Sequence, residues 1–333
     1  MEVRMRYLES PFQDPAYNLA LEQVVFDRLP RTDSYFMLWQ NQNAIIVGRH
    51  QNTAQEIDAA FVRDRDIKVV RRLSGGGAVY HDLGNLNFTY VTDSAPDSAL
   101  DMGFFCRPVA RALERLGVQA QLNGRNDITV DGQKFSGNAQ YVKEGRVMHH
   151  GTILFDSDLS VVSQALTVRA DKLASHAVGS VRSRVTNLRP YLPDDLTLEA
   201  FRVEFLNALF DAAPPQPYHW TEEDLQAAQL LYDQRYNTWD WNYGASPKGS
   251  LHKSRRIEDC GTIEVFLSLD KGHITELDFR GDWFGDEDLE PLLQTLIGLP
   301  LDLTALEQTL LQIPVDRWFK GLSPRQLAQL IAE

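Results

Sequence analysis

The sequence predicts a mixed α/β protein of the α+β type, with a largely antiparallel sheet and a separate small domain at its C-terminal end. Three observations support this prediction. Segments with strand-like alternation cluster in the first half of the chain, and segments with helical periodicity surround them. Two-residue turn signals join some of these strands as hairpins. After a stretch rich in glycine, serine and proline at 242–254, the pattern of strands and helices starts again.

Helical spacing of apolar residues predicts the helices of the large domain. Asn18 is the expected N-cap of the first helix, since asparagine often caps the free N–H groups of a first turn. Gly117 is the expected end of the second, because glycine commonly follows a last turn. The predicted helices cover 18–29, 99–116, 159–166, 198–212 and 222–236.

Apolar alternation predicts the strands of the large domain. An Asp-Gly pair at 131–132 and a Glu-Gly pair at 144–145 predict two hairpin turns. The three glycines at 75–77 are expected to join two strands rather than a strand and a helix. The predicted strands are two within 35–48 around a polar Asn-Gln-Asn turn, and others at 67–73, 86–92, 127–130, 133–136, 141–143 and 146–155.

The small domain is predicted from the restart of the pattern after the glycine-rich break. Residues 1–245 are assigned to the large domain and 250–333 to the small one. The expected small-domain elements are strands at 262–269 and 273–279 around a turn at 270–272, and helices at 289–296, 303–312 and 324–331.

Composition and charge narrow the range of functions. The 333 residues are 43% hydrophobic and 24% charged, which is typical of a globular protein. A net charge of −13 argues against a general nucleic-acid binder, although clustered arginines could still bind a small phosphorylated ligand. No apolar run approaches the ~20 residues of a membrane span, and the N-terminal residues lack the apolar core of a signal peptide. Two distant cysteines fit a reducing cytoplasm, where we expect the protein.

The segment RRLSGGGAVYHDLGN, residues 71–85, combines bare backbone with an arginine pair. Three glycines in a row are costly to order, so their exposed N–H groups beside Arg72 suggest a site for a phosphate or carboxylate. A tight structural turn is the alternative. The segment lacks the Gly-Lys-Ser/Thr ending of a Walker loop and the third glycine and following helix of a Rossmann fingerprint.

A second polar segment, GRNDITVDGQKFSGNAQ, places Lys134 just after a predicted hairpin turn. A lysine in a polar cleft can neutralise a phosphate and follow charge through a transition state, while an ordinary surface lysine is the alternative. His149 and His150 enter the next strand, and spacing alone does not decide whether they are buried or face a ligand. Zinc-site spacings and a serine-hydrolase elbow are absent from the sequence.

Taken together and in this order, these segments resemble the lipoate–protein ligases. RRLSGGGAVYHDLGN resembles the lipoate-binding loop, and GRNDITVDGQKFSGNAQ resembles the lysine motif. HHGTILFDSDLS and SVRSRVTNL resemble the following strand and the adenylate-binding loop, and WDWNYG at 239–244 resembles the segment that closes the large domain. The resemblance, over about 18–244, implies the fold of biotin and lipoate ligases, related to class II aminoacyl-tRNA synthetase cores.

The resemblance implies two half-reactions. Lipoate attacks the α-phosphate of ATP to give lipoyl-AMP and pyrophosphate, with Mg²⁺ neutralising the triphosphate. A lysine of an acceptor domain then attacks the mixed anhydride and AMP leaves. The implied acceptors are lipoyl domains of 2-oxoacid dehydrogenase E2 subunits and the glycine-cleavage H protein. We expect a monomer whose small domain rotates between the half-reactions, without nucleic-acid or membrane partners.

Site roles follow from the same resemblance, position by position. Lys134 is the implied catalytic residue and contacts both substrates. Asp127 either holds Mg²⁺ or orients Lys134, and Trp39 could line the tunnel for the lipoate tail. The implied ATP contacts are Arg72, Gly77, Ala78, Val79, Tyr80 and Lys134; the lipoate contacts are Ser74, Gly75, Gly76, His81, Lys134 and His150; the adenylate loop includes Ser180, Arg182 and Arg184.

Three rival functions share parts of this pattern. A cysteine-dependent octanoyl or lipoyl transferase has the same fold, but Cys106 is expected inside a helix and Cys260 in the small domain, both outside the motif loops. Biotin ligases use a different glycine-rich motif. A non-catalytic lipoyl-adenylate or acceptor-binding protein is disfavoured because Lys134 stands in its full motif.

Overall fold

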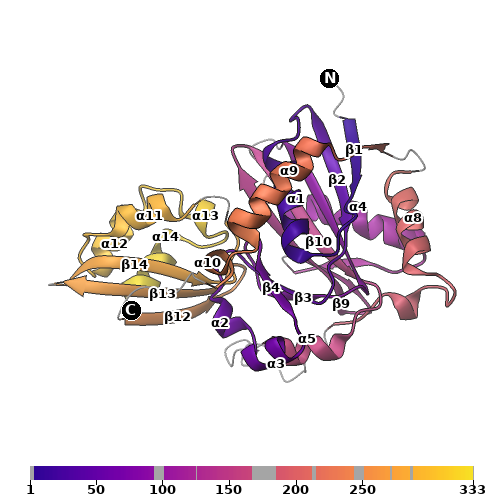
Figure 1. Ribbon diagram of the computed structural model, residues 1–333. Coiled ribbons are helices and arrows are strands. Elements are labelled where there is room, and N and C mark those ends of the chain that lie inside the picture. Colours follow the sequence, from indigo (N-terminus) through magenta and orange to yellow (C-terminus); the bar gives the residue numbers. More distant parts are fainter. Residues whose placement is uncertain are drawn as a thin grey trace.

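The structure is a computed structural model that describes residues 4–93, 101–124, 126–166, 185–211, 215–243, 251–270, 272–285 and 288–332. Figure 1 shows a large domain and, beside it, a small domain built from the C-terminal part of the chain. Within the described residues, no helix combines the length and apolarity that crossing a bilayer requires.

An eight-stranded sheet forms the centre of the large domain, in the order β11-β1-β2-β6-β10-β9-β8-β7. β1 pairs in parallel with β2 and β11, and the remaining described pairs are antiparallel, which confirms the predicted largely antiparallel sheet. The strands are β1 Arg4–Glu9, β2 Asp33–Trp39, β6 Asn85–Asp93, β7 Gln121–Asn123, β8 Asp127–Val130, β9 Gln133–Lys143, β10 Arg146–Leu154 and β11 Gln216–Pro217.

A second, three-stranded sheet carries the glycine loop. Its order is β4-β3-β5, with β3 at Ala44–Val47, β4 at Lys68–Arg71 and β5 at Val79–His81. The three glycines therefore join two strands, as predicted. The two strands expected within 35–48 are also present, but β2 and β3 belong to different sheets.

Both predicted hairpin turns are present. Asp131 and Gly132 have φ values of 49° and 75°, and Glu144 and Gly145 have 51° and 74°. Two consecutive residues with positive φ are what a tight hairpin turn requires. β9 is one continuous strand shared by both hairpins, and it carries Lys134 at its start.

Helices cover both faces of the large sheet (Figure 1). On β2, Phe36 and Leu38 pack with α4 and α8, while Tyr35, Met37 and Trp39 pack with α1 and α9. β2 is therefore apolar on both sides. The large-domain helices are α1 Pro15–Asp27, α2 Thr53–Glu56, α3 Ala59–Asp64, α4 Met102–Arg115, α5 Leu159–Ala165, α8 Leu198–Leu209, α9 Glu222–Leu231 and α10 Trp239–Asn242, with a 3₁₀ turn at Arg189–Tyr191 and a π-helical turn at Tyr232–Tyr236.

Helix α1 begins earlier than predicted, and its cap is Asp14 rather than Asn18. The Asp14 carboxylate accepts the N–H of Tyr17 at 3.0 Å, and Pro15 occupies the first turn, where its missing N–H costs no hydrogen bond. Asn18 is instead fully buried, and its amide donates to the carbonyls of Phe12 and Gln40.

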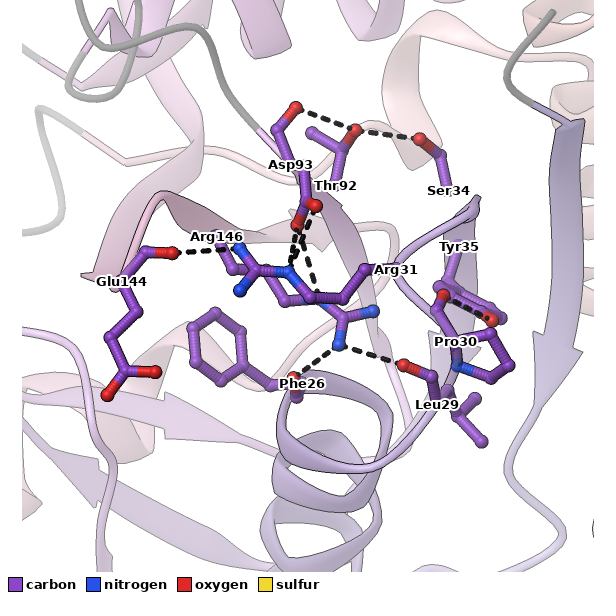
Figure 2. Close-up of polar contacts among 10 residues, drawn as sticks. All are labelled: Phe26, Leu29, Pro30, Arg31, Ser34, Tyr35, Thr92, Asp93, Glu144 and Arg146. Carbon is purple, nitrogen blue, oxygen red and sulfur yellow. Dashed lines mark hydrogen bonds and ion pairs between the residues drawn. The ribbon is translucent and has the colours of Figure 1, made fainter. Parts of the chain in front are cut away.

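The other end of α1 is held by a buried arginine at the start of β10 (Figure 2). Arg146 Nη1 donates to the carbonyls of Phe26 and Leu29 at 2.7 and 2.9 Å. The last carbonyls of a helix have no partner within the helix and carry partial negative charge, so a cation stabilises this end. The carboxylate of Asp93 lies 3.9 Å from Nε of Arg146. Both oxygens of this carboxylate also accept from Nε of Arg31, so Asp93 connects the two arginines. α1 is thereby fixed against the sheet.

The small domain has its own core, formed by residues between Ile257 and Ile331. β12 was not predicted, because its exposed polar sequence gives no apolar alternation. The short helix at Val315–Trp318 was not predicted either, and the other elements agree with the predicted order. The elements of the small domain are β12 Leu251–Ile257, β13 Gly261–Asp270, β14 His273–Gly281, α11 Glu290–Leu296, α12 Leu303–Leu310, α13 Val315–Trp318 and α14 Pro324–Ala332.

The two domains meet through main-chain hydrogen bonds. The N–H of Gly76 donates to the carbonyl of Trp283 at 3.1 Å, and the N–H of Gly281 donates to the carbonyl of His50 at 2.9 Å. The ring of His50 stacks on the indole of Trp283 with centroids 4.6 Å apart. The end of β14 and the residues after it therefore dock directly on the glycine loop.

Two of the three glycines are required by this contact. A Cβ on Gly75 would lie 2.2 Å from the carbonyl oxygen of Trp283, and a Cβ on Gly76 would lie 3.0 Å from the ring of Phe284. Gly76 also has a φ of +86°, which side chains rarely adopt. A Cβ on Gly77 would meet no atom within 4 Å. The backbone of Gly75 and Gly76 thus accommodates the small domain, a use that the sequence did not suggest.

Replacing Arg146 with methionine should destabilise the large domain. The substitution keeps most of the apolar stem but leaves the carbonyls of Phe26 and Leu29 without their donor, which should lower the free energy of unfolding by about 2–4 kcal/mol. Arg31→Met, at a half-exposed ion pair, should cost less than about 1 kcal/mol. Urea unfolding of both variants measures the difference, and equal losses would contradict this role of Arg146.

Gly75→Ala should loosen the docking of the small domain, because the new methyl group cannot share space with a backbone oxygen. Hydrogen exchange of peptides covering 281–284 should accelerate by roughly 10-fold or more. Gly77→Ala is the matched control and should leave that exchange rate unchanged. Slow exchange in both variants would show that the contact tolerates the methyl group.

Candidate active site

A cavity lies where the glycine loop, α1, β9, β10 and the small domain meet. Its apolar wall comes from side chains of α1, β2, β3 and β5, and Phe284 of the small domain contributes to it as well. Its polar wall comes mostly from β9, β10 and the glycine loop. The lining residues are Leu19, Trp39, Ile46, Arg72, Gly76, Gly77, Ala78, Val79, His81, Asn87, Asn126, Lys134, Gly137, Asn138, Ala139, His150, Gly151, Thr152 and Phe284.

The buried guanidinium of Arg72 shapes the glycine loop. Its Nη2 donates to the carbonyls of Gly75 and Gly77 at 2.6 and 2.9 Å, and its Nη1 donates to the carbonyl of Ile46 at 3.1 Å. Burial lowers the pKa of Arg72 to about 10, and the nearby carboxylate of Glu22 opposes that shift. The side chain therefore remains a cation at neutral pH.

The hydrogen bonds from Arg72 to the loop carbonyls also orient the N–H groups of the loop. In a trans peptide, the C=O and the following N–H point in opposite directions. The carbonyls of Gly75 and Gly77 face Arg72, so the N–H groups of Gly76 and Ala78 are turned away from it. The N–H of Gly76 binds Trp283, and Ala78 lines the cavity.

Strand alternation divides the three residues of β5 between two sides. Val79 and His81 line the cavity, while the ring of Tyr80 packs in a separate core with Ile45 and Val47. The Tyr80 hydroxyl donates to Asn43, and burial raises the pKa of Tyr80 to about 12. The structure therefore does not bring the side chain of Tyr80 to the cavity.

His81 is a neutral imidazole in this environment. Its Nδ1 lies 3.1 Å from the side-chain nitrogen of Asn41, and burial lowers the pKa of His81 to about 3. Trp39 lies edge-on to the ring with centroids 6.1 Å apart. The apolar end of the cavity thus contains two aromatic residues.

Lys134 lies on the polar wall, in an ion pair with Asp127. The two side chains are 2.7 Å apart, and each is about one-third exposed. A β-bulge follows Lys134, since Thr129 pairs with Lys134 whereas Ile128 pairs with Ser136. Asp127 and Lys134 thus lie on two adjacent strands of one hairpin.

The spacing of Lys134 and Gly137 has a direct structural reason. A Cβ on Gly137 would lie 2.9 Å from Lys134 Nζ and 3.0 Å from its Cε, so the glycine leaves room for the lysine side chain. The N–H of Gly137 donates to the hydroxyl of Thr152 at 3.1 Å. Gly137 of the lysine motif therefore leaves the space that the Lys134 side chain occupies.

The ion pair places Asp127 where it could orient Lys134. Among the described residues, no three His, Cys, Asp or Glu side chains gather as a protein-held metal site requires. Both roles of Asp127, orienting Lys134 and binding magnesium, stay predictions.

Ser74 and His150 lie together beneath the glycine loop. Ser74 Oγ lies 2.6 Å from His150 Nε2 and accepts Nε–H of Arg72 at 2.9 Å. His150 lines the cavity, whereas Ser74 is 1% exposed and does not. Ser180, Arg182 and Arg184 fall outside the described residues.

Several residues at or near the cavity were not among the predicted contacts. Leu19 lines the cavity, and Glu22 lies behind it, one helical turn later on the buried side of α1. A glutamate on such an apolar face was the available signal. Phe284 comes from the small domain, and no local sequence pattern connects it to the other lining residues, which all lie in the first half of the chain.

The cysteines do not support a thioester mechanism. Cys106 is 2% exposed in α4, and burial raises the pKa of its thiol to about 12. Cys260 is fully buried in the core of the small domain. Neither cysteine lines the cavity, so the transferase alternative lacks an accessible thiolate.

Sequence comparisons agree with these observations. Residues 14–210 match the family model of the lipoyl protein ligase A/B catalytic domain, and residues 246–331 match that of the bacterial lipoate protein ligase C-terminus. The chain is 41% identical over 321 residues to lipoate-protein ligase LplJ of Bacillus subtilis, covering 96% of this chain and 97% of the relative. It is 38% identical over 319 residues to lipoate–protein ligase 1 of Staphylococcus aureus, covering 96% and 97%.

Solved structures show the same architecture. LipL1 of P. falciparum, in complex with lipoate, superposes with a TM-score of 0.78 at 20% identity and covers 98% of both chains. A lipoate-protein ligase A bound with ATP superposes with a TM-score of 0.63 at 27% identity, covering 74% of this chain and all of the other. The predicted fold class is confirmed, and the chain belongs to the lipoate–protein ligase family.

Proposed function

We propose that this protein is an ATP-dependent lipoate–protein ligase, which converts lipoate to lipoyl-AMP and transfers the lipoyl group to a lysine of an acceptor protein. One observation carries the proposal: the Lys134–Asp127 pair stands beside a cavity that is apolar at one end and bounded by the Arg72-shaped loop. Such a cavity offers an apolar wall to an acyl chain and a cation to its carboxylate.

In the first half-reaction, the lipoate tail occupies the apolar wall and its carboxylate points toward Lys134. Leu19 and Trp39, on the apolar wall, contact the tail. The ammonium of Lys134 screens the repulsion between the carboxylate and the α-phosphate and stabilises the charge that develops as the carboxylate oxygen bonds to phosphorus and pyrophosphate leaves. Asp127 keeps Lys134 in position until the substrates arrive.

The glycine loop contributes donors for the nucleotide. Arg72 holds the loop so that the N–H of Ala78 is turned away from the guanidinium, and this N–H and that of Gly77 bind phosphate oxygens. Mg²⁺ bound to ATP would neutralise the triphosphate, and since this ion usually keeps several waters it would need only one or two protein carboxylates, of which Asp127 is the candidate. Lys134 and Arg72 remain the protein's own cations at the site.

In the second half-reaction, the acceptor amine attacks the acyl carbonyl, an amide forms and AMP leaves. Lys134 polarises that carbonyl. Phe284 and the small domain form part of the cavity wall, so rotation of the small domain away from Gly75 and Gly76 would give the acceptor access. We propose the division into domains at 1–245 and 250–333 for this movement.

The acceptors are proposed to be E2 lipoyl domains and the glycine-cleavage H protein. A neighbouring structure at 26% identity and TM-score 0.65 is a bi-partite lipoate protein ligase of Thermoplasma acidophilum described together with its E2 lipoyl domain. This likeness supports an E2 acceptor. We further propose that the enzyme works as a monomer in the cytoplasm.

The intact mass of a purified apo lipoyl domain tests the proposal. After incubation with this protein, lipoate and Mg²⁺, the domain should gain one lipoyl group only when ATP is present. A gain from an acyl-carrier donor without ATP, and none with free lipoate, would show a transferase instead.

Lys134→Ala should lower lipoate-dependent pyrophosphate release by about 100- to 1000-fold, because the developing charge loses its preorganised cation. The melting temperature should change little, since the Lys134 side chain is partly exposed. Lys143→Ala, at the exposed end of the same strand, is the matched control and should keep the parent rate. Near-parent pyrophosphate release by Lys134→Ala would remove this residue from the mechanism.

A further inference from the structure

A chain of buried hydrogen bonds connects the indole of β2 with the glycine loop and passes through a carboxylate of α1. Each of its six residues is at most 7% exposed. The bonds are Trp39 Nε1 to Thr89 Oγ1 (2.9 Å), Thr89 Oγ1 to Glu22 Oε1 (2.7 Å), His150 Nδ1 to Glu22 Oε1 (2.8 Å), Ser74 Oγ to His150 Nε2 (2.6 Å) and Arg72 Nε to Ser74 Oγ (2.9 Å).

The fold brings the middle of this chain together. His150 of β10 lies directly opposite Thr89 of β6 in the sheet register. Glu22 lies one turn after the pocket residue Leu19 on α1 and reaches both side chains from above the sheet. A glutamate at this place is 1% exposed, so its charge needs partners within the protein.

The carboxylate in the middle of the chain fixes the direction of the hydrogen bonds. A carboxylate can only accept, so Thr89 donates to Glu22 and accepts from the indole N–H of Trp39. For the same reason His150 donates to Glu22 from Nδ1. In a neutral imidazole Nε2 is then an acceptor, so Ser74, which accepts from Arg72, uses its own proton for His150 Nε2. All bonds converge on one carboxylate.

We propose that Glu22 is a positioning residue of the ligase site: it holds His150 in the tautomer with the proton on Nδ1, and through Ser74 it holds Arg72 where Arg72 shapes the glycine loop. The kinetic part of this inference rests on the proposed function, whereas the tautomer does not. Glu22 itself does not line the cavity, so it acts through His150, which does.

Charge supports the same arrangement. The carboxylate of Glu22 and the guanidinium of Arg72 are both buried, and the side chains of His150 and Ser74 join them. Their attraction acts over this bridge and raises the pKa of Arg72 against the effect of burial. A buried ion that loses its partner is strongly destabilised, so removal of Glu22 should disturb Arg72 as well as His150.

Nitrogen NMR of histidine-labelled protein without ligands tests the tautomer directly. The parent protein should show His150 as a neutral ring protonated at Nδ1, with the signal identified by its loss in His150→Asn. Glu22→Ala should shift the ring toward the Nε2–H form, while Glu22→Gln should keep it, because an amide oxygen can still accept from Nδ1. An Nε2–H or doubly protonated His150 in the parent protein would overturn the proposal even if Glu22→Ala did not fold.

Kinetics test the consequence for the site. Glu22→Ala should lower kcat/KM for lipoate by roughly 10- to 100-fold, and Glu22→Gln should recover most of that loss. Ser74→Ala breaks the same chain, so the double variant Glu22→Ala/Ser74→Ala should be little worse than either single variant. Multiplied losses in the double variant would contradict a shared path.

Gln23→Ala is the matched control, because Gln23 is the next residue of α1 and its buried amide accepts from Tyr236 and Arg235 rather than from the chain. It should lower stability but leave the His150 tautomer and kcat/KM for lipoate near the parent values. Equal losses of kcat/KM in Glu22→Ala and Gln23→Ala would contradict the positioning role and show that Glu22 contributes only to the stability of the core. If the parent protein lacks ligase activity but His150 has the expected tautomer, only the proposed function fails.

Discussion

The buried guanidinium of Arg72 is the interaction on which the site depends most. One planar cation binds three backbone carbonyls and the hydroxyl of Ser74, and in doing so it determines the course of the glycine loop. A loop of three glycines has little conformational preference of its own, so its shape has to be imposed by such contacts. The charge of Arg72 is in turn balanced by Glu22 on α1.

The glycine loop serves two neighbours at once. On one side Gly75 and Gly76 accept the backbone of Trp283 and the ring of Phe284, so the small domain closes part of the cavity. On the other side Gly77 and Ala78 line the cavity itself. A movement of the small domain therefore changes the contacts of the glycine loop, which is also the segment that faces the substrates.

Local sequence signals predicted much of the fold. The Asp-Gly and Glu-Gly turns gave both hairpins around Lys134, because consecutive residues with positive φ leave few alternatives. The predicted start of α1 was wrong. Asn18 is an acceptable N-cap, but Asp14 followed by Pro15 is a better one. β12 was not predicted, because its exposed residues lack a buried face.

The sequence predicted the part of the site whose interacting residues belong to one motif. It did not predict the part where residues from distant segments of the chain meet. Lys134, Asp127 and Gly137 belong to one hairpin, so their spacing already contains the geometry. The convergence of Trp39, Glu22 and His150 and the arrival of Phe284 depend on the packing of four separate elements. Tyr80 shows the same limit, since strand alternation points its ring away from the cavity.

A crystal structure with a non-hydrolysable lipoyl-adenylate analogue would test the central claim most directly. We expect the acyl chain beside Leu19 and Trp39, with the bridging phosphate within hydrogen-bond distance of Lys134 Nζ and of the N–H of Ala78. An analogue bound with its phosphate away from Lys134, or outside the cavity beside the glycine loop, would contradict the account.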